Sequence, residues 1–149
     1  TVNTSIIKST QIYSESERNL RLLGLRDGET LGKDRELQGQ SPFLINSGLN
    51  YEGVKNGIQM GMNYNVQGKT LQVVGNGFVP DVYTMPFHNL NFNLSKSFGE
   101  NQNQSVSFKI SNLLDDDVES EYESYKAQNQ TFSKRSPGKS FSLGYNLKF

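Results

Sequence analysis

The residues able to do chemistry at a catalytic or metal site are few in this sequence. It contains one histidine, His88, and no cysteine. Histidine is a common base and metal ligand, but both roles require further groups beside it. No cluster of carboxylates lies near His88 in the sequence, so we interpret it as a polar residue at the beginning of a strand. No Ser/His/Asp set, phosphate loop or pair of catalytic carboxylates stands out either. We therefore predict that the chain is not an enzyme and that it binds no cofactor.

An acidic segment is the other candidate for metal chemistry. The stretch DDDVESEYE at 115–123 carries six carboxylates, and carboxylate oxygens are ligands for Ca²⁺. It lacks the glycine and the spacing of an EF-hand loop. A solvated, charged loop is the better interpretation, and we predict no metal site.

A third segment combines apolar and charged residues. NLRLLGLRDGETLG at 19–32 places four leucines inside an otherwise charged connection: Leu20, Leu22, Leu23 and Leu25. They would either pack on neighbouring loops or contact a substrate or another protein. We favour packing.

The composition favours β structure. The mean hydropathy is −0.63 and 34% of residues are hydrophobic, yet 11% are aromatic, which is unusual for a disordered chain. Ala127 is the single alanine, whereas Ser, Asn and Gly are abundant. A helical protein would contain more alanine, so we expect strands joined by many turns.

Charge and hydropathy exclude several partners and leave one open. The net charge is zero, so nothing in the balance indicates nucleic acid or an anionic surface. No apolar run exceeds three residues, so we expect neither a transmembrane helix nor a signal peptide within these 149 residues. Transmembrane strands give a much weaker hydropathy signal, and a membrane location therefore stays possible.

Strict alternation of apolar and polar residues predicts six strands. Five of them have a clear phase: 42–52, 57–67, 88–98, 104–112 and 140–149. A first strand within about 2–13 is less defined, because Ile6 and Ile7 do not reveal its phase. After Gly68 the phase shifts, which indicates a bulge or a strand that continues above a membrane.

The connections between these strands alternate in length. The segments 52–57 and 99–103 are short turns rich in Gly and Asn, and 75–86 is longer. The connections 15–36 and 115–135 are long and hold 20 of the 30 charged residues. Short turns at one end and long polar loops at the other are typical of an outer-membrane barrel, with its periplasmic turns and extracellular loops.

The composition of the two faces supports the same fold class. The polar faces carry mostly Asn, Ser, Gln and Gly, with Lys109 and Lys148 as exceptions, which suits a lumen filled by water or by another domain. The apolar faces suit a lipid belt, and Tyr51, Tyr145 and Phe149 fall near strand ends where aromatic girdles lie. We therefore predict an all-β chain of antiparallel up-and-down strands, forming as one segment, 1–149, the last six or so strands of a transmembrane β-barrel. The alternative is a soluble β-sandwich whose core is lined by the apolar face.

The last eight residues, SLGYNLKF, match the β-signal of outer-membrane proteins. Ser142, Gly144, Leu147 and Phe149 occupy its polar, glycine, hydrophobic and final aromatic positions. Barrel assembly machinery can recognise such a strand by adding it to a sheet edge. We predict that these four residues form the assembly signal.

Four further stretches resemble the C-terminal end of TonB-dependent outer-membrane receptors in the style of the Bacteroidetes. They are LQGQSPFLINSGLNYE (37–52), PDVYTMPFHNLNFNLSKSFG (80–99), VSFKISNLLDD (106–116) and SPGKSFSLGYNLKF (136–149). The resemblance implies a barrel of about 22 strands, plugged by an N-terminal domain, that imports nutrients in the outer membrane. It implies as partners the lipid bilayer, the earlier strands and plug, and TonB through that plug. It also allows a surface lipoprotein as a partner.

No plug, TonB-binding segment or substrate motif is recognisable in the sequence itself, so the resemblance assigns a location and a parent protein rather than a substrate. A different outer-membrane barrel, porin-like or adhesin-like, remains the closest alternative.

Overall fold

The computed structural model describes residues 1–25, 27–28, 30–123 and 128–148. Within these residues the chain is all-β, and its strands pair in antiparallel sheets. One α-helix, α1 (Glu15–Gly24), and one short 3-10 helix, η1 (Glu100–Gln102), complete the described elements. The predicted all-β class and the antiparallel pairing are confirmed.

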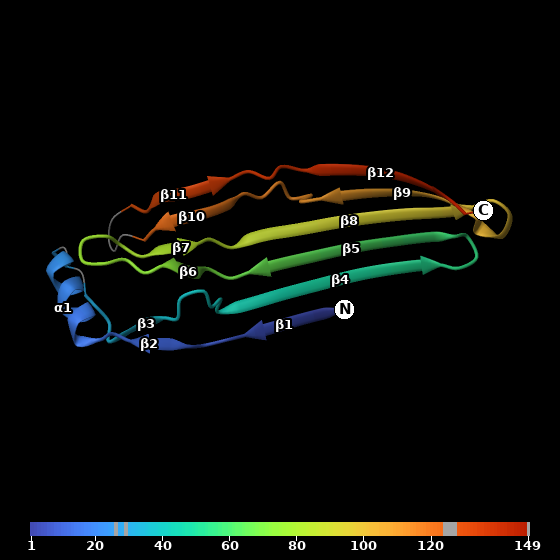
Figure 1. The fold of residues 1–149 in the computed structure, drawn as a ribbon. Helices are drawn as coiled ribbons and strands as arrows, with labels where there is room; N and C mark the ends of the chain where they lie inside the picture. Colours follow the sequence, from blue (N-terminus) through green and yellow to red (C-terminus); the bar gives the residue numbers. More distant parts are fainter. Residues whose placement is uncertain (26, 29, 124–127, 149) are drawn as a thin grey trace.

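The larger sheet contains the six strands predicted from alternation. They are β1 (Val2–Ile6), β4 (Phe43–Gly53), β5 (Ile58–Gln67), β8 (Phe87–Phe98), β9 (Gln104–Ser111) and β12 (Ser140–Leu147), in the order β1-β4-β5-β8-β9-β12. Each strand lies beside the next one along the chain, which makes the sheet an up-and-down meander (Figure 1). The sheet is open, with β1 and β12 as its edges. We call it the six-strand sheet.

Beyond one end of this sheet, the chain continues as shorter strands. A four-stranded sheet has the order β11-β10-β7-β6, formed by β6 (Thr70–Val73), β7 (Val82–Thr84), β10 (Val118–Tyr122) and β11 (Gln130–Arg135). The strands β2 (Thr10–Ile12) and β3 (Asp34–Glu36) pair with each other, and α1 lies between them in the chain. These elements, with the described residues that connect them, are the loop-end layer, on the left of Figure 1.

The loop-end layer corrects two expectations. We expected 15–36 and 115–135 to be long loops, but they contain α1 and β3, and β10 and β11. The helix begins where the Ser14 hydroxyl accepts a hydrogen bond from the Glu17 amide at 3.2 Å, an N-cap that a count of alanines does not detect. The β10–β11 pair is supported by an edge-on contact between the rings of Tyr122 and Phe132, whose centroids are 5.2 Å apart.

The short turns are where the sequence predicts them. The β4–β5 turn and the β8–β9 turn lie together at the end of the molecule opposite α1 (Figure 1). Gly57 and Gly99 adopt φ values of +64° and +85°, which side chains disfavour and glycine adopts without strain. Short connections therefore occupy one end and long connections the other.

Hydrogen bonds hold the junction between the two regions. Gly68 follows β5, and its amide donates to the Phe43 carbonyl at 2.9 Å. The buried hydroxyl of Ser41 donates to the carbonyls of Phe43 and Gly68. After Gly68 the chain resumes as β6, whose pairing with β7 shifts register between Leu71 and Val73. The sequence predicted a change in the apolar–polar alternation after Gly68. The structure shows both a register shift there and a further strand, β6.

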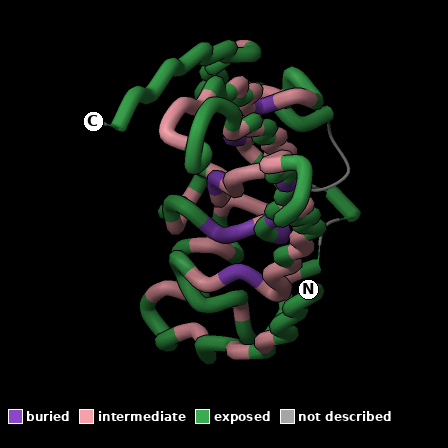
Figure 2. Tube along the Cα trace, turned by 90° about the vertical axis from the view of Figure 1, so that its right-hand side faces the viewer, coloured by how far each residue is buried: buried purple, intermediate pink, exposed green. Residues whose placement is uncertain are grey.

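The buried apolar residues are few and lie near this junction and beyond it. Among the described residues the buried hydrophobic side chains are Val66, Leu71 and Val82, of which two belong to the loop-end layer. Figure 2, which looks along the strands, shows buried stretches as short pieces of an otherwise exposed or half-exposed trace. The six-strand sheet has no core of its own.

Candidate functional site

The register of the six-strand sheet gathers its apolar side chains on one face. Opposite residues in antiparallel strands project to the same side, so each ladder row can be followed across the sheet. One row across five strands consists of Leu49, Met62, Phe92, Ile110 and Phe141. The next row consists of Tyr51, Met60, Leu94, Phe108 and Leu143. The result is a continuous apolar face.

This apolar face is uncovered. Leu49, Leu143 and Phe141 are 76%, 78% and 64% exposed, and no described element packs over them. A soluble monomer rarely exposes a contiguous apolar patch of this extent. In a β-sandwich the same face would meet a second sheet, and the described residues form none that lies against it.

The opposite face is polar and nearly free of charge. One row consists of Asn3, Asn46, Asn65 and Asn89, in which the Asn65 amide donates to the Asn46 side-chain oxygen. A second row contains Asn50, Gly61, Asn93, Lys109 and Ser142. A hollow of about 720 Å³ opens on this face beside Asn91 and Lys109. Such a wall can accept and donate hydrogen bonds to water or to a polar surface.

Polar and aromatic groups mark the two borders of the apolar face. Near the loop-end layer, the Tyr64 hydroxyl lies 2.7 Å from Nδ1 of His88. Near the short turns, the Lys96 ammonium donates to the Asn56 carbonyl, and the Tyr145 hydroxyl donates to Gln104 at 3.0 Å. Long amphipathic side chains of this kind place their polar ends at the edge of an apolar region.

Three of the four predicted assembly-signal residues lie on β12, an edge strand that pairs with β9 on one side only. Ser142 and Gly144 belong to the polar face, opposite Lys109 and Ser107, and Leu147 belongs to the apolar face. The fourth, Phe149, lies outside the described residues.

The His88 and acidic-segment candidates find ordinary partners. The His88 backbone amide donates to Asp116 at 2.6 Å, near the beginning of β8. Four of the six carboxylates of 115–123 form ion pairs, with three different lysines: Asp115 with Lys139, Asp117 and Glu119 with Lys134, and Glu123 with Lys69. In the described part of the chain no three potential ligands converge on one point.

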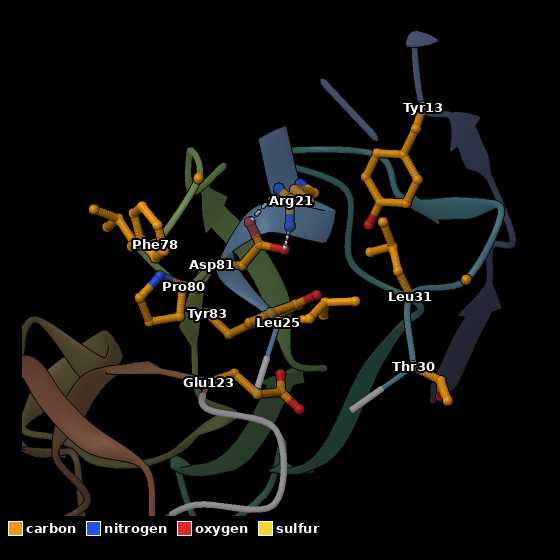
Figure 3. Close-up of a pocket in the computed structure, with 14 residues that line it drawn as sticks. Tyr13, Arg21, Leu25, Thr30, Leu31, Phe78, Pro80, Asp81, Tyr83 and Glu123 are labelled. Carbon is orange, nitrogen blue, oxygen red and sulfur yellow. Dashed lines mark hydrogen bonds and ion pairs between the residues drawn. The ribbon is translucent and has the colours of Figure 1, made fainter. Parts of the chain in front are cut away.

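A pocket in the loop-end layer was not predicted from the sequence. It has a volume of about 300 Å³ and is lined mainly by Tyr13, Arg21, Leu25, Leu31, Phe78, Pro80, Asp81, Tyr83 and Glu123 (Figure 3). These residues come from the segments 13–32, 77–83 and 123. Because the lining residues are distant from one another in the sequence, no local sequence motif predicts the pocket.

An ion pair holds the two sides of this pocket together. The guanidinium of Arg21 on α1 donates to both carboxylate oxygens of Asp81, at 2.7 and 3.1 Å, and to the Gly75 carbonyl at 3.2 Å. The Gly75 amide donates to Asp81 at 2.7 Å. Both side chains of the pair are largely buried, and the hydrogen bond to Asp81 raises the pKa of Arg21 above its usual value. We call this contact the Arg21–Asp81 clamp.

The pKa values of the two tyrosines of the pocket are also raised. Burial raises the pKa of Tyr83, and the neighbouring Asp81, Glu36 and Glu123 carboxylates add to the effect. Burial likewise raises the pKa of Tyr13. One face of each ring is covered by a cation, Arg21 at 5.1 Å from the Tyr13 centroid and Lys69 at 4.3 Å from the Tyr83 centroid.

The leucine-rich segment packs less than we expected. Leu20, Leu22 and Leu23 are 45%, 45% and 71% exposed, and α1 has no buried residue. Leu25 alone among the four lines the pocket. The prediction that all four leucines pack on neighbouring loops is therefore wrong. The contact that holds the helix is made by Arg21 and not by the leucines.

No helix in the described residues is long and apolar enough to cross a membrane. Comparison with protein families, with curated proteins and with solved structures finds no match for this chain.

Proposed function

We propose that the chain is the C-terminal part of a transmembrane β-barrel in a bacterial outer membrane, belonging to a TonB-dependent receptor for nutrient uptake. The observation that carries the proposal is the apolar face of the six-strand sheet, continuous across five strands and uncovered. A face of this kind needs an apolar solvent, and the lipid bilayer supplies one. The neutral polar face then lines the lumen.

The dimensions of the apolar face fit a bilayer. On β5, apolar side chains run from Ile58 to Val66, eight residue steps that span about 26 Å at a rise of about 3.3 Å per step. At the strand tilt of about 35° found in outer-membrane barrels, this length corresponds to an apolar face roughly 22 Å tall, close to the apolar band of about 25 Å of such barrels.

The two ends of the sheet support an orientation. The short turns suit the periplasmic side, and the loop-end layer, with its helix and charged hairpin, suits the cell surface. Tyr145 and Lys96, which lie at the turn border, are then at the periplasmic interface of the outer membrane.

The more specific assignment, to a TonB-dependent receptor, rests on the four receptor-like stretches of the sequence. In such a receptor the partners of this chain are the earlier strands, the plug in the lumen, the bilayer and the barrel assembly machinery. TonB acts through the plug, and a surface lipoprotein would meet the loop-end layer. A porin-like or adhesin-like barrel shares the apolar face but lacks a plug.

Protease treatment of intact cells tests the topology. Cleavage is expected in the exposed described parts of 15–36 and 115–135, while the turns 54–57 and 99–103 stay intact until the outer membrane is opened. Cleavage of those turns in intact cells would contradict the orientation. A protein that is soluble and monomeric without detergent would contradict the membrane assignment and favour a β-sandwich.

Substitution of the terminal aromatic residue tests the assembly role. Phe149→Ala should reduce the amount of folded, heat-modifiable protein in the outer membrane, because the final position of the signal is lost. Ser140→Ala, on the same strand but outside the octapeptide, is the control. Equal assembly of the two variants would mean that the octapeptide is ordinary strand sequence.

A further inference from the structure

We propose that Lys96 binds the phosphate of one phospholipid in the periplasmic leaflet of the outer membrane, and that the acyl chains of this lipid lie along β8. The proposal rests on the proposed function, because it takes the apolar face to lie against a bilayer with the short turns on the periplasmic side. It assigns a headgroup site to a face whose other residues contact lipid without selecting it.

Lys96 lies on the apolar face of the six-strand sheet. The register places it between Ile58 on β5 and Val106 on β9, both of which project to that face. Among the described residues of this face it is the one lysine, arginine, aspartate or glutamate. It is exposed, and it lies two residues before the end of β8. A charged side chain at the edge of a lipid-facing surface extends its charged end toward the membrane interface.

The Lys96 ammonium has donors left for an acceptor outside the chain. An ammonium carries three N–H donors, and one of them donates to the Asn56 carbonyl. No carboxylate in the described part of the chain forms an ion pair with it. Glu52, on β4 near the same turn, projects to the polar face and accepts a hydrogen bond from Gln59 at 3.1 Å. An anion that approaches the apolar face at this border therefore meets an uncompensated positive charge.

The strip of apolar residues beside Lys96 fits an acyl chain. Along β8 the next residues on the same face are Leu94 and Phe92, and Leu94 is flanked on the neighbouring strands by Met60 and Phe108. From Lys96 to Phe92 is four residue steps, about 13 Å, close to half of an apolar band of about 25 Å. A lipid whose phosphate lies at Lys96 thus has its chains on apolar side chains through the depth of one leaflet.

The group that fits this charge is a phosphate diester. Phosphate is the anionic group that a glycerophospholipid carries at headgroup depth, and an ammonium makes short, charge-assisted hydrogen bonds to its oxygens. The opposite border of the apolar face offers no such cation in its described residues, since the polar groups there are the Tyr64 hydroxyl and Nδ1 of His88, 2.7 Å apart. The position of Lys96 at the turn border alone therefore points to the periplasmic leaflet.

A matched pair of lipids tests the headgroup site. Lipid binding to the purified full-length protein in detergent is measured by native mass spectrometry with dioleoyl phosphatidylglycerol and with dioleoylglycerol, which has the same acyl chains and no phosphate. The first phosphatidylglycerol should bind at least about fivefold more tightly, the effect of one lysine at a lipid surface. Inorganic phosphate at millimolar concentration should not displace it, because the acyl chains supply part of the binding. Equal affinity for the two lipids, or displacement by inorganic phosphate, overturns the proposal.

Variants at two lysines then locate the site. Lys96→Gln should weaken the binding of phosphatidylglycerol about fivefold and leave that of dioleoylglycerol unchanged, whereas Lys96→Arg should retain both affinities. Lys109→Gln is the matched control, because it removes the same charge from the neighbouring strand β9 but on the polar face, opposite Asn93. Equal effects of Lys96→Gln and Lys109→Gln, or no effect of either, overturn the proposal.

Membrane integration is scored separately for every variant, by the requirement for detergent and by heat-modifiable migration. Unchanged lipid affinity of Lys96→Gln in a detergent-dependent, heat-modifiable protein rejects the lipid site and leaves the proposed function standing. A protein that is soluble and monomeric without detergent rejects the proposed function, and the lipid site with it.

Discussion

The loop-end layer and the six-strand sheet differ in how far their apolar side chains are exposed. The loop-end layer shields its apolar residues with the chain itself, and Leu71 and Val82 there are 0% and 2% exposed. The six-strand sheet, by contrast, leaves residues such as Leu49 and Leu143 more than three-quarters exposed. In the six-strand sheet, no described residue covers the apolar face.

The polar interactions differ between the regions as well. Bidentate and partly buried ion pairs, such as the Arg21–Asp81 clamp and the Arg35–Glu17 pair, hold the loop-end layer together. In the six-strand sheet the side chains of the polar face are mainly neutral, and ladder hydrogen bonds do most of the joining. Chain-wide averages hide this contrast, because a mean hydropathy of −0.63 combines a strongly segregated sheet with a charged layer. The separation of apolar and polar side chains onto opposite faces of the sheet is therefore more informative than the mean hydropathy.

The sharpest test of the contrast places one charge on either face of a single strand. Leu94→Arg puts a guanidinium in the middle of the apolar face, and we expect it to lower the free energy of unfolding by about 2–4 kcal/mol in lipid. Asn93→Arg, the neighbouring residue on the polar face, should cost far less. Urea unfolding of the reconstituted protein, followed by heat-modifiable migration, measures both. Equal costs would mean that the two faces meet the same solvent.

The next test concerns the loop-end layer alone. Arg21→Met removes the cation of the clamp and leaves the largely buried Asp81 unpaired, which should destabilise the layer locally by about 2 kcal/mol. Hydrogen exchange should become faster in α1 and in 74–81 but stay unchanged in β5 and β8. Arg18→Met, on the exposed side of the same helix, is the control. Faster exchange throughout the six-strand sheet would show that the two regions unfold as one.

The sequence predicted the six-strand sheet better than the loop-end layer, for a physical reason. Alternation is a local signal, so the faces of β5 and β8 were readable residue by residue and their pairing followed from short turns. The glycines and asparagines at 52–57 and 99–103 set those turns locally too. The first strand was the exception, because Ile6 and Ile7 interrupt the alternation.

The loop-end layer depends on contacts between distant residues, which patterns do not show. Arg21 and Asp81 are 60 positions apart, and each alone resembles any charged loop residue. Similarly, Tyr13 and Tyr83 meet at one pocket only after α1 has docked. The helix itself had one local signal, Ser14 followed by Glu15 and Glu17, an N-cap with acidic residues in the first turn.

The junction between the two regions offers a smaller perturbation. A Cβ atom added at Gly68 would lie 2.7 Å from the Phe43 ring, so Gly68→Ala must displace that ring. We expect a loss of about 1 kcal/mol in the free energy of unfolding. Gly32→Ala is the control, because its Cβ would meet its nearest neighbour at 3.4 Å, an ordinary contact. If both variants unfold like the wild type, the junction is more plastic than the structure indicates.

The smallest expected effect is a pH dependence confined to the loop-end layer. The pKa of Tyr83 is raised in the folded chain, mainly by burial, whereas in the unfolded chain the phenol ionises near its usual value of 10.0. The folded state therefore retains the proton more strongly, so this contribution to stability is complete below pH 10.0 and is lost as the pH rises above it. Tyr83→Phe, which cannot ionise, should show a shallower alkaline loss of hydrogen-exchange protection in β6 and β7. The six-strand sheet of the same sample is the internal reference, and its protection should not change with the substitution. An alkaline slope in β6 and β7 that matches the wild type would show that the Tyr83 phenol is solvated after all.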